Sequence, residues 1–179
     1  LHAASLVPDG GTLQIGIGQV GDALAQGLIV RHRDNGQFNA IMKRLAPAAG
    51  QGQGSPLETG RFEKGLYGVS EMLIEAFLGL IDAGILKREV DGVMLHGAFF
   101  VGPKSLYRAL REMPAEQLKR IQMMPVSFTN QLYGDEDVKR RDRVDARFVN
   151  TAMMATLMGA AISDGLENGQ VVSGVGGQY

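Results

Sequence analysis

The sequence predicts an α/β fold in which a mainly parallel β-sheet is flanked by helices and followed by a late antiparallel hairpin. Two observations predict it. Short apolar runs with strand character alternate with longer stretches whose apolar residues recur at helical spacing. Near the C-terminal end, the dipeptide Asn168-Gly169 separates two short runs and is typical of a tight hairpin turn.

The first half of the chain supplies the first strands of this sheet. In order, we expect a strand at 12–15, helices at 20–30 and 38–45, a strand at 66–69 and a helix at 73–83. Residues 46–64 contain few large apolar side chains and many Gly, Pro and Gln residues. This composition predicts an exposed loop insertion.

The second half continues the alternation. We expect a strand at 92–95, helices at 103–113 and 116–123, strands at 125–129, 148–157 and 160–162, and a segment at 170–173 that pairs back after the hairpin turn.

Composition excludes several classes of protein. The 179 residues suffice for one domain, and the 45% apolar and 21% charged residues are typical of a globular protein. A net charge of -1 indicates no affinity for nucleic acid or anionic lipid. The chain has no cysteine, its three histidines show no metal-binding spacing, and no apolar run approaches a membrane span. We therefore expect a cytoplasmic protein without a bound metal.

A glycine motif follows the first predicted strand. Residues 16–21, Gly-Ile-Gly-Gln-Val-Gly, match GxGxxG and open a helix, which is the form of a dinucleotide-binding fingerprint. That fingerprint also needs an acid after a second strand about 20 residues on. Asp34 lies near that distance but follows no strand. An NAD(P)-binding, Rossmann-like oxidoreductase and a glycine turn without a ligand both remain open.

Six segments, in order, resemble the acetyl-CoA hydrolase / CoA-transferase family. They are DGGTLQIGIG at 9–18, GVSEM at 68–72, LIDAG at 80–84, FVGPKSLY at 100–107, PVSFTN at 125–130 and GQVVSGVGGQ at 169–178. The resemblance implies a fold of the NagB/RpiA/CoA-transferase type. It implies that residues 1–179 form a single domain from the C-terminal catalytic half of a longer chain, without its N-terminal domain. It also implies a homo-oligomer, and it leaves open whether the fragment is active alone.

The resemblance also implies the chemistry. It identifies Glu71 as the nucleophile that attacks an acyl-CoA thioester, first giving a glutamyl anhydride and then a glutamyl-CoA thioester. A small carboxylate then takes up the CoA and leaves as a new acyl-CoA, which makes the enzyme a CoA-transferase. If water intercepts instead, the net result is hydrolysis. Coenzyme A enters as part of the substrate, and no separate cofactor is implied. An ordinary acid near a helix N-terminus is the alternative interpretation of Glu71.

Further site residues follow from the same motifs. Gly176, Gly177 and Gln178 match the family's GGQ and are candidates to stabilise a developing oxyanion or to bind CoA. Gly16 and Gly18, with Asn130 and His96, are candidates for the substrate pocket. Asn130 is equally interpretable as a turn residue, and His96 as a structural hydrogen-bonding histidine. A catalytically inactive CoA-binding or assembly module is the non-enzymatic alternative.

Overall fold

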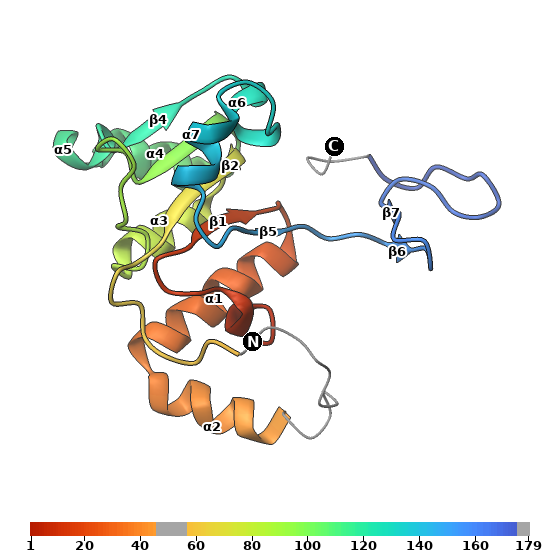
Figure 1. The fold of residues 1–179 in the computed structure, drawn as a ribbon, viewed down its shortest axis with the longest axis horizontal. Coiled ribbons are helices and arrows are strands. Elements are labelled where there is room, and N and C mark those ends of the chain that lie inside the picture. Colours follow the sequence, from red (N-terminus) through yellow and green to blue (C-terminus); the bar gives the residue numbers. More distant parts are fainter. Residues whose placement is uncertain (46–56, 175–179) are drawn as a thin grey trace.

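A five-stranded parallel sheet forms the centre of the molecule. The computed structural model describes residues 1–45 and 57–174. The strand order is β4-β3-β2-β1-β5, and every neighbouring pair is parallel (Figure 1). The strands are β1 (Thr12–Ile15), β2 (Tyr67–Leu73), β3 (Leu95–Phe100), β4 (Ile121–Met123) and β5 (Arg147–Val149). An antiparallel pair, β6 (Met154–Ala155) and β7 (Ala161–Ile162), follows. These observations confirm the predicted fold class.

The helices connect the strands across the two faces of the sheet. They are the 3₁₀-helix η1 (Ala4–Leu6), then α1 (Gln19–Arg33), α2 (Asn35–Leu45), α3 (Glu75–Asp82), α4 (Lys104–Glu112), α5 (Ala115–Leu118), α6 (Val126–Asn130) and α7 (Glu136–Asp142). The crossovers that join β1 to β4 contain α1, α3 and α4, and because such crossovers are almost always right-handed, these helices cover one face. The chain then returns to β5 at the far edge, and α6 on this return contacts β2 and β3.

The main core lies between the sheet and the first set of helices. Leu13 and Leu28 from β1 and α1, Phe77 from α3 and Leu106 from α4 are all fully buried in one apolar cluster. All four residues of β1 are buried, as expected for a central parallel strand covered on both faces. This packing fixes the carboxyl ends of β1 and β2 relative to each other.

The glycine motif forms a tight turn between β1 and α1. A Cβ on Gly21 would lie 2.2 Å from the Gly16 carbonyl oxygen, so only glycine permits this close helix–strand approach. Gly18 precedes the helix with a φ of 106°, in the region that favours glycine. Asp34 is the C-cap of α1 and leads directly into α2, so it does not follow a strand as the dinucleotide fingerprint requires.

Several predicted elements differ from the structure. Residues 125–129 were expected to form a strand but lie in helix α6 and its N-cap, and the end of the helix expected at 116–123 is strand β4. Pro125 suits the start of a helix, and α6 is too short to show helical periodicity. The third strand begins at Leu95, later than expected. The strand expected at 148–157 is divided into β5 and β6.

The hairpin turn at Asn168-Gly169 is present, although the pairing beside it is short. The Gly169 amide donates to the Leu166 carbonyl, and an isolated antiparallel bridge joins Gly165 to Val171. The regular antiparallel pair is formed instead by β6 and β7. The late antiparallel hairpin is therefore confirmed, with its ladder placed earlier in the chain than the turn motif indicated.

Buried contacts anchor the end of the predicted loop insertion. Residues 46–56 lie outside the described residues, and 57–64 contain no helix or strand. In 57–64, Phe62 is fully buried, so this part of the predicted loop is not wholly exposed. The Arg31 guanidinium lies 4.3 Å from the centre of the Phe62 ring. Arg31 also donates hydrogen bonds to the carbonyls of Ala4, Val7 and Gly60. This buried cation joins η1, α1 and the loop.

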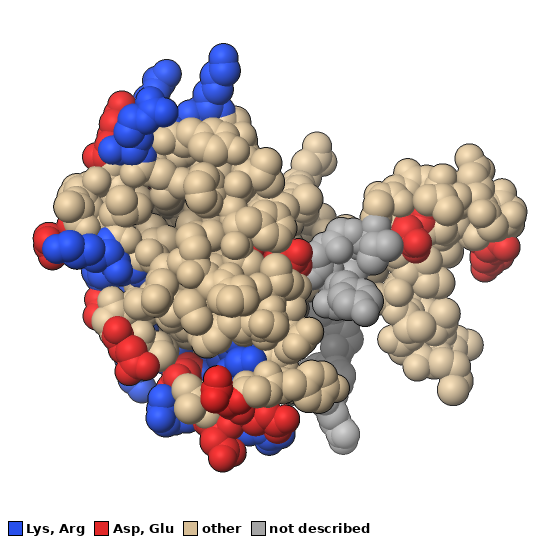
Figure 2. Space-filling view, turned by 90° about the horizontal axis from the view of Figure 1, so that it is seen from above, with Lys and Arg blue, Asp and Glu red and all other residues tan. Residues whose placement is uncertain are grey.

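The chain beyond β5 forms an arm that extends from the body, as Figure 1 shows. Its apolar residues Leu157 and Met158 are fully exposed. Residues 148–174 contain Asp164 and Glu167 but no Lys or Arg, and in Figure 2 the arm is a lobe with acidic and no basic side chains. Residues 150–174, termed the arm below, contribute one wall of the cavity described next.

Candidate active site

Glu71 lies near the carboxyl end of β2, with one carboxylate oxygen held in place. Its Oε2 accepts a hydrogen bond of 2.9 Å from Nδ2 of Asn130, the last residue of α6. The Thr129 hydroxyl lies 2.9 Å from Asn130 Oδ1, which orients the amide nitrogen of Asn130 towards Glu71. Within the described part of the chain, Glu71 Oε1 has no hydrogen-bond partner. The contact therefore fixes the orientation of the carboxylate through one of its two oxygens.

Two cations hold α6, and with it Asn130, against the sheet. Lys139 of α7 is buried, and its Nζ donates to the carbonyls of Ser127, Gln131 and Tyr133 at 3.3, 3.0 and 2.8 Å. The Arg143 guanidinium donates to the Phe128 carbonyl. Because these bonds satisfy carbonyls in and just after a short helix, they stabilise its C-terminal end.

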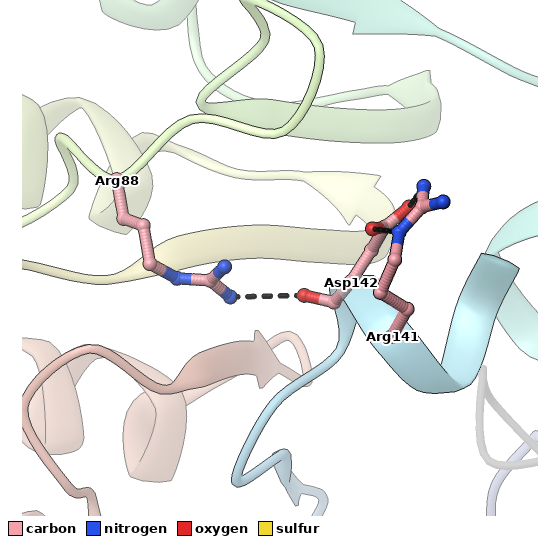
Figure 3. Close-up of polar contacts among 3 residues, drawn as sticks. All are labelled: Arg88, Arg141 and Asp142. Atoms are coloured by element: carbon pink, nitrogen blue, oxygen red, sulfur yellow. Dashed lines mark hydrogen bonds and ion pairs between the residues drawn. The ribbon is translucent and has the colours of Figure 1, made fainter.

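Arg88 in turn fixes the end of α7 (Figure 3). Its Nη2 donates to the Asp142 carbonyl at 3.1 Å and to the Thr12 hydroxyl at 2.8 Å. The Asp142 carboxylate points to the other side and forms a two-bond ion pair with Arg141, at 2.7 and 3.1 Å. A chain of contacts thus runs from β1 through α7 and α6 to the Glu71 carboxylate.

A cavity of about 520 Å³ opens beside Glu71. It is lined by residues 14–17 of β1 and the following turn, by Glu71 and Met72 of β2, by Phe99 of β3 and by six residues of the arm. Glu71 is the only ionisable side chain among these residues. The cavity lies at the carboxyl ends of the strands. At this point the strand order reverses: from β1 the chain adds β2, β3 and β4 on one side, and β5 later joins the other side of β1. Parallel sheets commonly bind ligands at such a switch point.

The other candidate residues are placed differently. Gly16 lines the cavity, and a Cβ there would lie 2.8 Å from Asn150 Oδ1, so a larger residue would displace Asn150. Gly18 is the N-cap of α1 and is not among the lining residues. Gly176, Gly177 and Gln178 lie outside the described residues, so their role as oxyanion or CoA contacts stays a prediction.

His96 lies in β3, buried beneath α6 rather than on the cavity wall. Its Nδ1 is 2.5 Å from the Tyr67 hydroxyl, and its Nε2 is 3.2 Å from Gln122 Oε1. Its ring also contacts Phe128 of α6, at 5.0 Å between centres. Burial lowers the pKa of His96, and the nearby Arg143 lowers it further, whereas burial raises the pKa of Tyr67 to about 12. This geometry suits a neutral histidine that joins β2, β3 and β4.

The environment of His96 predicts a pH-dependent stability. A lowered folded-state pKa means that the unfolded chain binds the proton more readily. The contribution of neutral His96 to the free energy of unfolding is therefore complete above pH 6.5. It decreases as the pH falls from there towards the folded-state pKa of His96. We expect His96→Gln to flatten the rise of unfolding free energy between about pH 5 and 7 in urea titrations. The exposed His2→Gln serves as control, and an unchanged slope in His96→Gln would contradict this account.

The contact between Asn130 and Glu71 gives a second prediction. Asn130→Ala removes the donor that anchors Oε2, so we expect kcat to fall roughly 10- to 100-fold, with a smaller change in KM. Gln131→Ala, the next residue along, is the control because only its backbone carbonyl takes part in the Lys139 contacts. Steady-state kinetics check this, and equal losses in the two variants would argue against a positioning role.

Two lining residues were not singled out from the sequence. Gln14 is the one amide side chain in β1, and Asn150 directly follows β5. Gln14 Nε2 donates to Asn150 Oδ1 at 3.1 Å. Two sequence signals could have identified them: Gln14 is a polar residue within a short apolar strand, and Asn150 is an amide residue at a strand end. The described residues bring no group of three or more His, Asp or Glu side chains together in a way that could hold a metal ion.

Comparison with protein families agrees with the sequence motifs. Residues 102–179 match the acetyl-CoA hydrolase/transferase C-terminal domain. This match confirms the resemblance on the C-terminal part of the chain, whereas Glu71 lies before the matched residues. No curated protein matches the chain.

Two similar solved structures support the fold. The chain superposes on the structure of a RipA point mutant with a TM-score of 0.63 and 22% identity, over 99% of this chain and 31% of that one. RipA from Yersinia pestis gives a TM-score of 0.59 and 21% identity, over 90% of this chain and 29% of that one. The chain thus spans about a third of the length of these proteins. Among the described residues, no helix has the length and apolar character needed to cross a membrane.

Proposed function

We propose that this chain, whose residues 102–179 match the acetyl-CoA hydrolase/transferase C-terminal domain, supplies the nucleophile of an acyl-CoA hydrolase or an acyl-CoA:carboxylate CoA-transferase. The observation that supports the proposal best is the Glu71 carboxylate. One of its oxygens is anchored by Asn130, and it is the only ionisable group among the described residues that line the cavity. No Lys, Arg or His is among the described lining residues, so none of them forms an ion pair with the Glu71 carboxylate.

The first half-reaction forms an enzyme-bound CoA ester. Glu71 Oε1 attacks the thioester carbonyl carbon, the C–S bond breaks, and CoA leaves as a thiolate while the acyl group and Glu71 form a mixed anhydride. The thiolate then attacks the glutamyl carbonyl carbon. The original acyl group leaves as a carboxylate, and Glu71 is left as a glutamyl-CoA thioester. Each step exchanges one carbonyl substituent for another, so no oxidant, reductant or metal takes part in the balance.

The second half-reaction decides between transferase and hydrolase. A new carboxylate attacks the glutamyl-CoA thioester, releases the CoA thiolate and forms a second anhydride. The thiolate then attacks the incoming acyl carbonyl, which yields a new acyl-CoA and regenerates the Glu71 carboxylate. If water attacks the thioester instead, CoA is released as the free thiol. As part of this proposal, we assign oxyanion stabilisation to Gly176, Gly177 and Gln178. We also expect the active protein to be a homo-oligomer whose chain includes an N-terminal domain.

Product analysis tests the proposed function. The full protein is incubated with acetyl-CoA alone and with acetyl-CoA plus propionate. Free thiol in the first reaction indicates hydrolysis, and propionyl-CoA in the second indicates transfer. Binding of CoA without either product would contradict the proposal and favour the inactive CoA-binding module. A tightly retained nicotinamide cofactor would favour the oxidoreductase alternative.

A further inference from the structure

Gln14 is a buried amide with an unpaired acceptor on the wall of the Glu71 cavity. The side chain exposes only 8% of its surface. Its Nε2 donates to Asn150 Oδ1, but its buried Oε1 has no hydrogen-bond partner among the residues that the structure describes. Leaving a buried carbonyl unpaired is unfavourable, and such groups usually have a partner in the functional state.

Asn150 presents the complementary group. Its Oδ1 is occupied by Gln14, whereas its Nδ2 has no acceptor within residues 1–45 and 57–174. If both amides are rotated by 180°, the roles exchange and the pair still offers one free donor and one free acceptor. The close approach of Gly16 to Asn150 Oδ1 limits where this amide can move. The pair is therefore suited to a ligand group that has one donor and one acceptor.

The pair lies close to the reacting carboxylate. Leu13 of β1 is level with Gly68 of β2, so Gln14 is level with Val69, two residues before Glu71 on the neighbouring strand. Gln14, Asn150 and Glu71 all line the same cavity. A group bound by the two amides would thus be held a short distance from the atom that Glu71 attacks.

We infer that Gln14 and Asn150 bind the secondary amide of the pantetheine arm that is nearest to the thioester sulfur. The inference rests on the proposed function and identifies a positioning contact for it. A secondary amide carries one N–H and one C=O, which match the free acceptor and the free donor. In an acyl-CoA this amide is separated from the sulfur by two methylene groups, so binding it places the thioester near Glu71. A carboxylate, which only accepts hydrogen bonds, would leave the Gln14 acceptor unpaired.

Paired small thioesters test the inference in the full protein. S-acetyl-N-acetylcysteamine contains this amide at the same distance from sulfur, whereas S-butyl thioacetate does not. We expect the wild-type protein to use the amide ester with a kcat/KM roughly 10- to 100-fold higher than for the other ester. Gln14→Met should lower kcat/KM for the amide ester more than for the amide-free ester, so that most of the preference is lost.

A second variant keeps the test independent of folding. Asn150 is exposed, and Asn150→Asp retains an acceptor for Gln14 Nε2 while it removes the free donor. It should reduce the preference for the amide ester in the same way. Gln26→Met, an exposed glutamine on α1, is the control and should keep the wild-type preference.

Three outcomes would overturn the inference. The wild-type protein could fail to prefer the amide ester, or both variants could lose activity equally on both esters. In these two cases, a CoA adduct on Glu71 in the wild-type protein would show that the proposed function survives while the Gln14 contact does not. If acetyl-CoA gives neither an adduct nor turnover in the wild-type protein, the proposed function and the inference both fail.

Discussion

Glu71→Gln is expected to reduce the turnover of acyl-CoA by roughly 10³-fold or more. Glutamine has nearly the same size, and its carbonyl oxygen can still accept the hydrogen bond from Asn130. The amide nitrogen, however, cannot attack a thioester as the carboxylate does. We therefore expect CoA binding to persist while kcat falls. Release of free thiol and formation of new acyl-CoA measure kcat, and a direct binding titration measures the affinity for CoA.

Glu75→Gln is the matched control for this variant. Glu75 lies four residues further on, in the exposed first turn of α3, and it receives the same change of charge and shape. Its activity should stay within about twofold of the wild-type value, as is usual for a surface substitution. If Glu71→Gln were as active as Glu75→Gln, Glu71 would be an ordinary acid at the end of a strand and not a nucleophile.

Arg31→Met is expected to lower the free energy of unfolding by roughly 3 to 5 kcal/mol. The methionine can fill most of the space beside Phe62, but it leaves the carbonyls of Ala4, Val7 and Gly60 without their donor. Because these carbonyls belong to η1, the turn after it and the described end of the loop, several contacts weaken together. Urea denaturation followed by circular dichroism gives the difference.

Arg33→Met separates this effect from the loss of a positive charge. Arg33 is on the same helix, is exposed and donates one hydrogen bond to the Asp82 carbonyl. We expect a change of less than about 1 kcal/mol, since a single exposed contact contributes little. If the two variants were equally stable, the buried position of Arg31 would have no special importance for the fold.

Much of the fold could be predicted because it depends on hydrophobic patterns that extend over whole helices and strands. The alternation of apolar strands with periodic helices is visible in the sequence, and β1, α1, α2 and α4 occur close to their expected positions. The two elements assigned the wrong type, α6 and β4, are segments of five and three residues. In such short segments tertiary contacts outweigh local preference, and periodicity cannot distinguish a helix from a strand. The Lys139 contacts that stabilise the end of α6 join α7 to this helix and leave no local signal.

The candidate site was predictable only through residues that belong to motifs. Family resemblance singled out Glu71 and Asn130, and the structure places them in hydrogen-bonding contact although they are 59 positions apart. It could not show that Asn150 comes from an arm that folds back beside β1, nor that Gln14 has an unpaired oxygen. Both facts depend on which strands are neighbours in the sheet, and β1 and β5 are separated by most of the chain.

The position of Glu71 also depends on contacts away from the cavity. Its anchor, Asn130, lies at the end of a five-residue helix, and that helix is held by Lys139 and Arg143. Short helices are unstable alone, so the position of Asn130 depends on the contacts of Lys139 and Arg143. Helices α6 and α7 thus support the Glu71 carboxylate.

The most direct test of the central claim is a peptide mass map of the full protein after a brief incubation with acetyl-CoA. Cleavage after Lys64 and Lys87 gives a peptide of residues 65–87, which contains both Glu71 and Glu75. We predict a CoA or acetyl adduct on this peptide, assigned to Glu71 by its fragment ions and absent in Glu71→Gln. A protein that binds CoA but carries no adduct, or an adduct that persists in Glu71→Gln, would contradict the covalent role of Glu71.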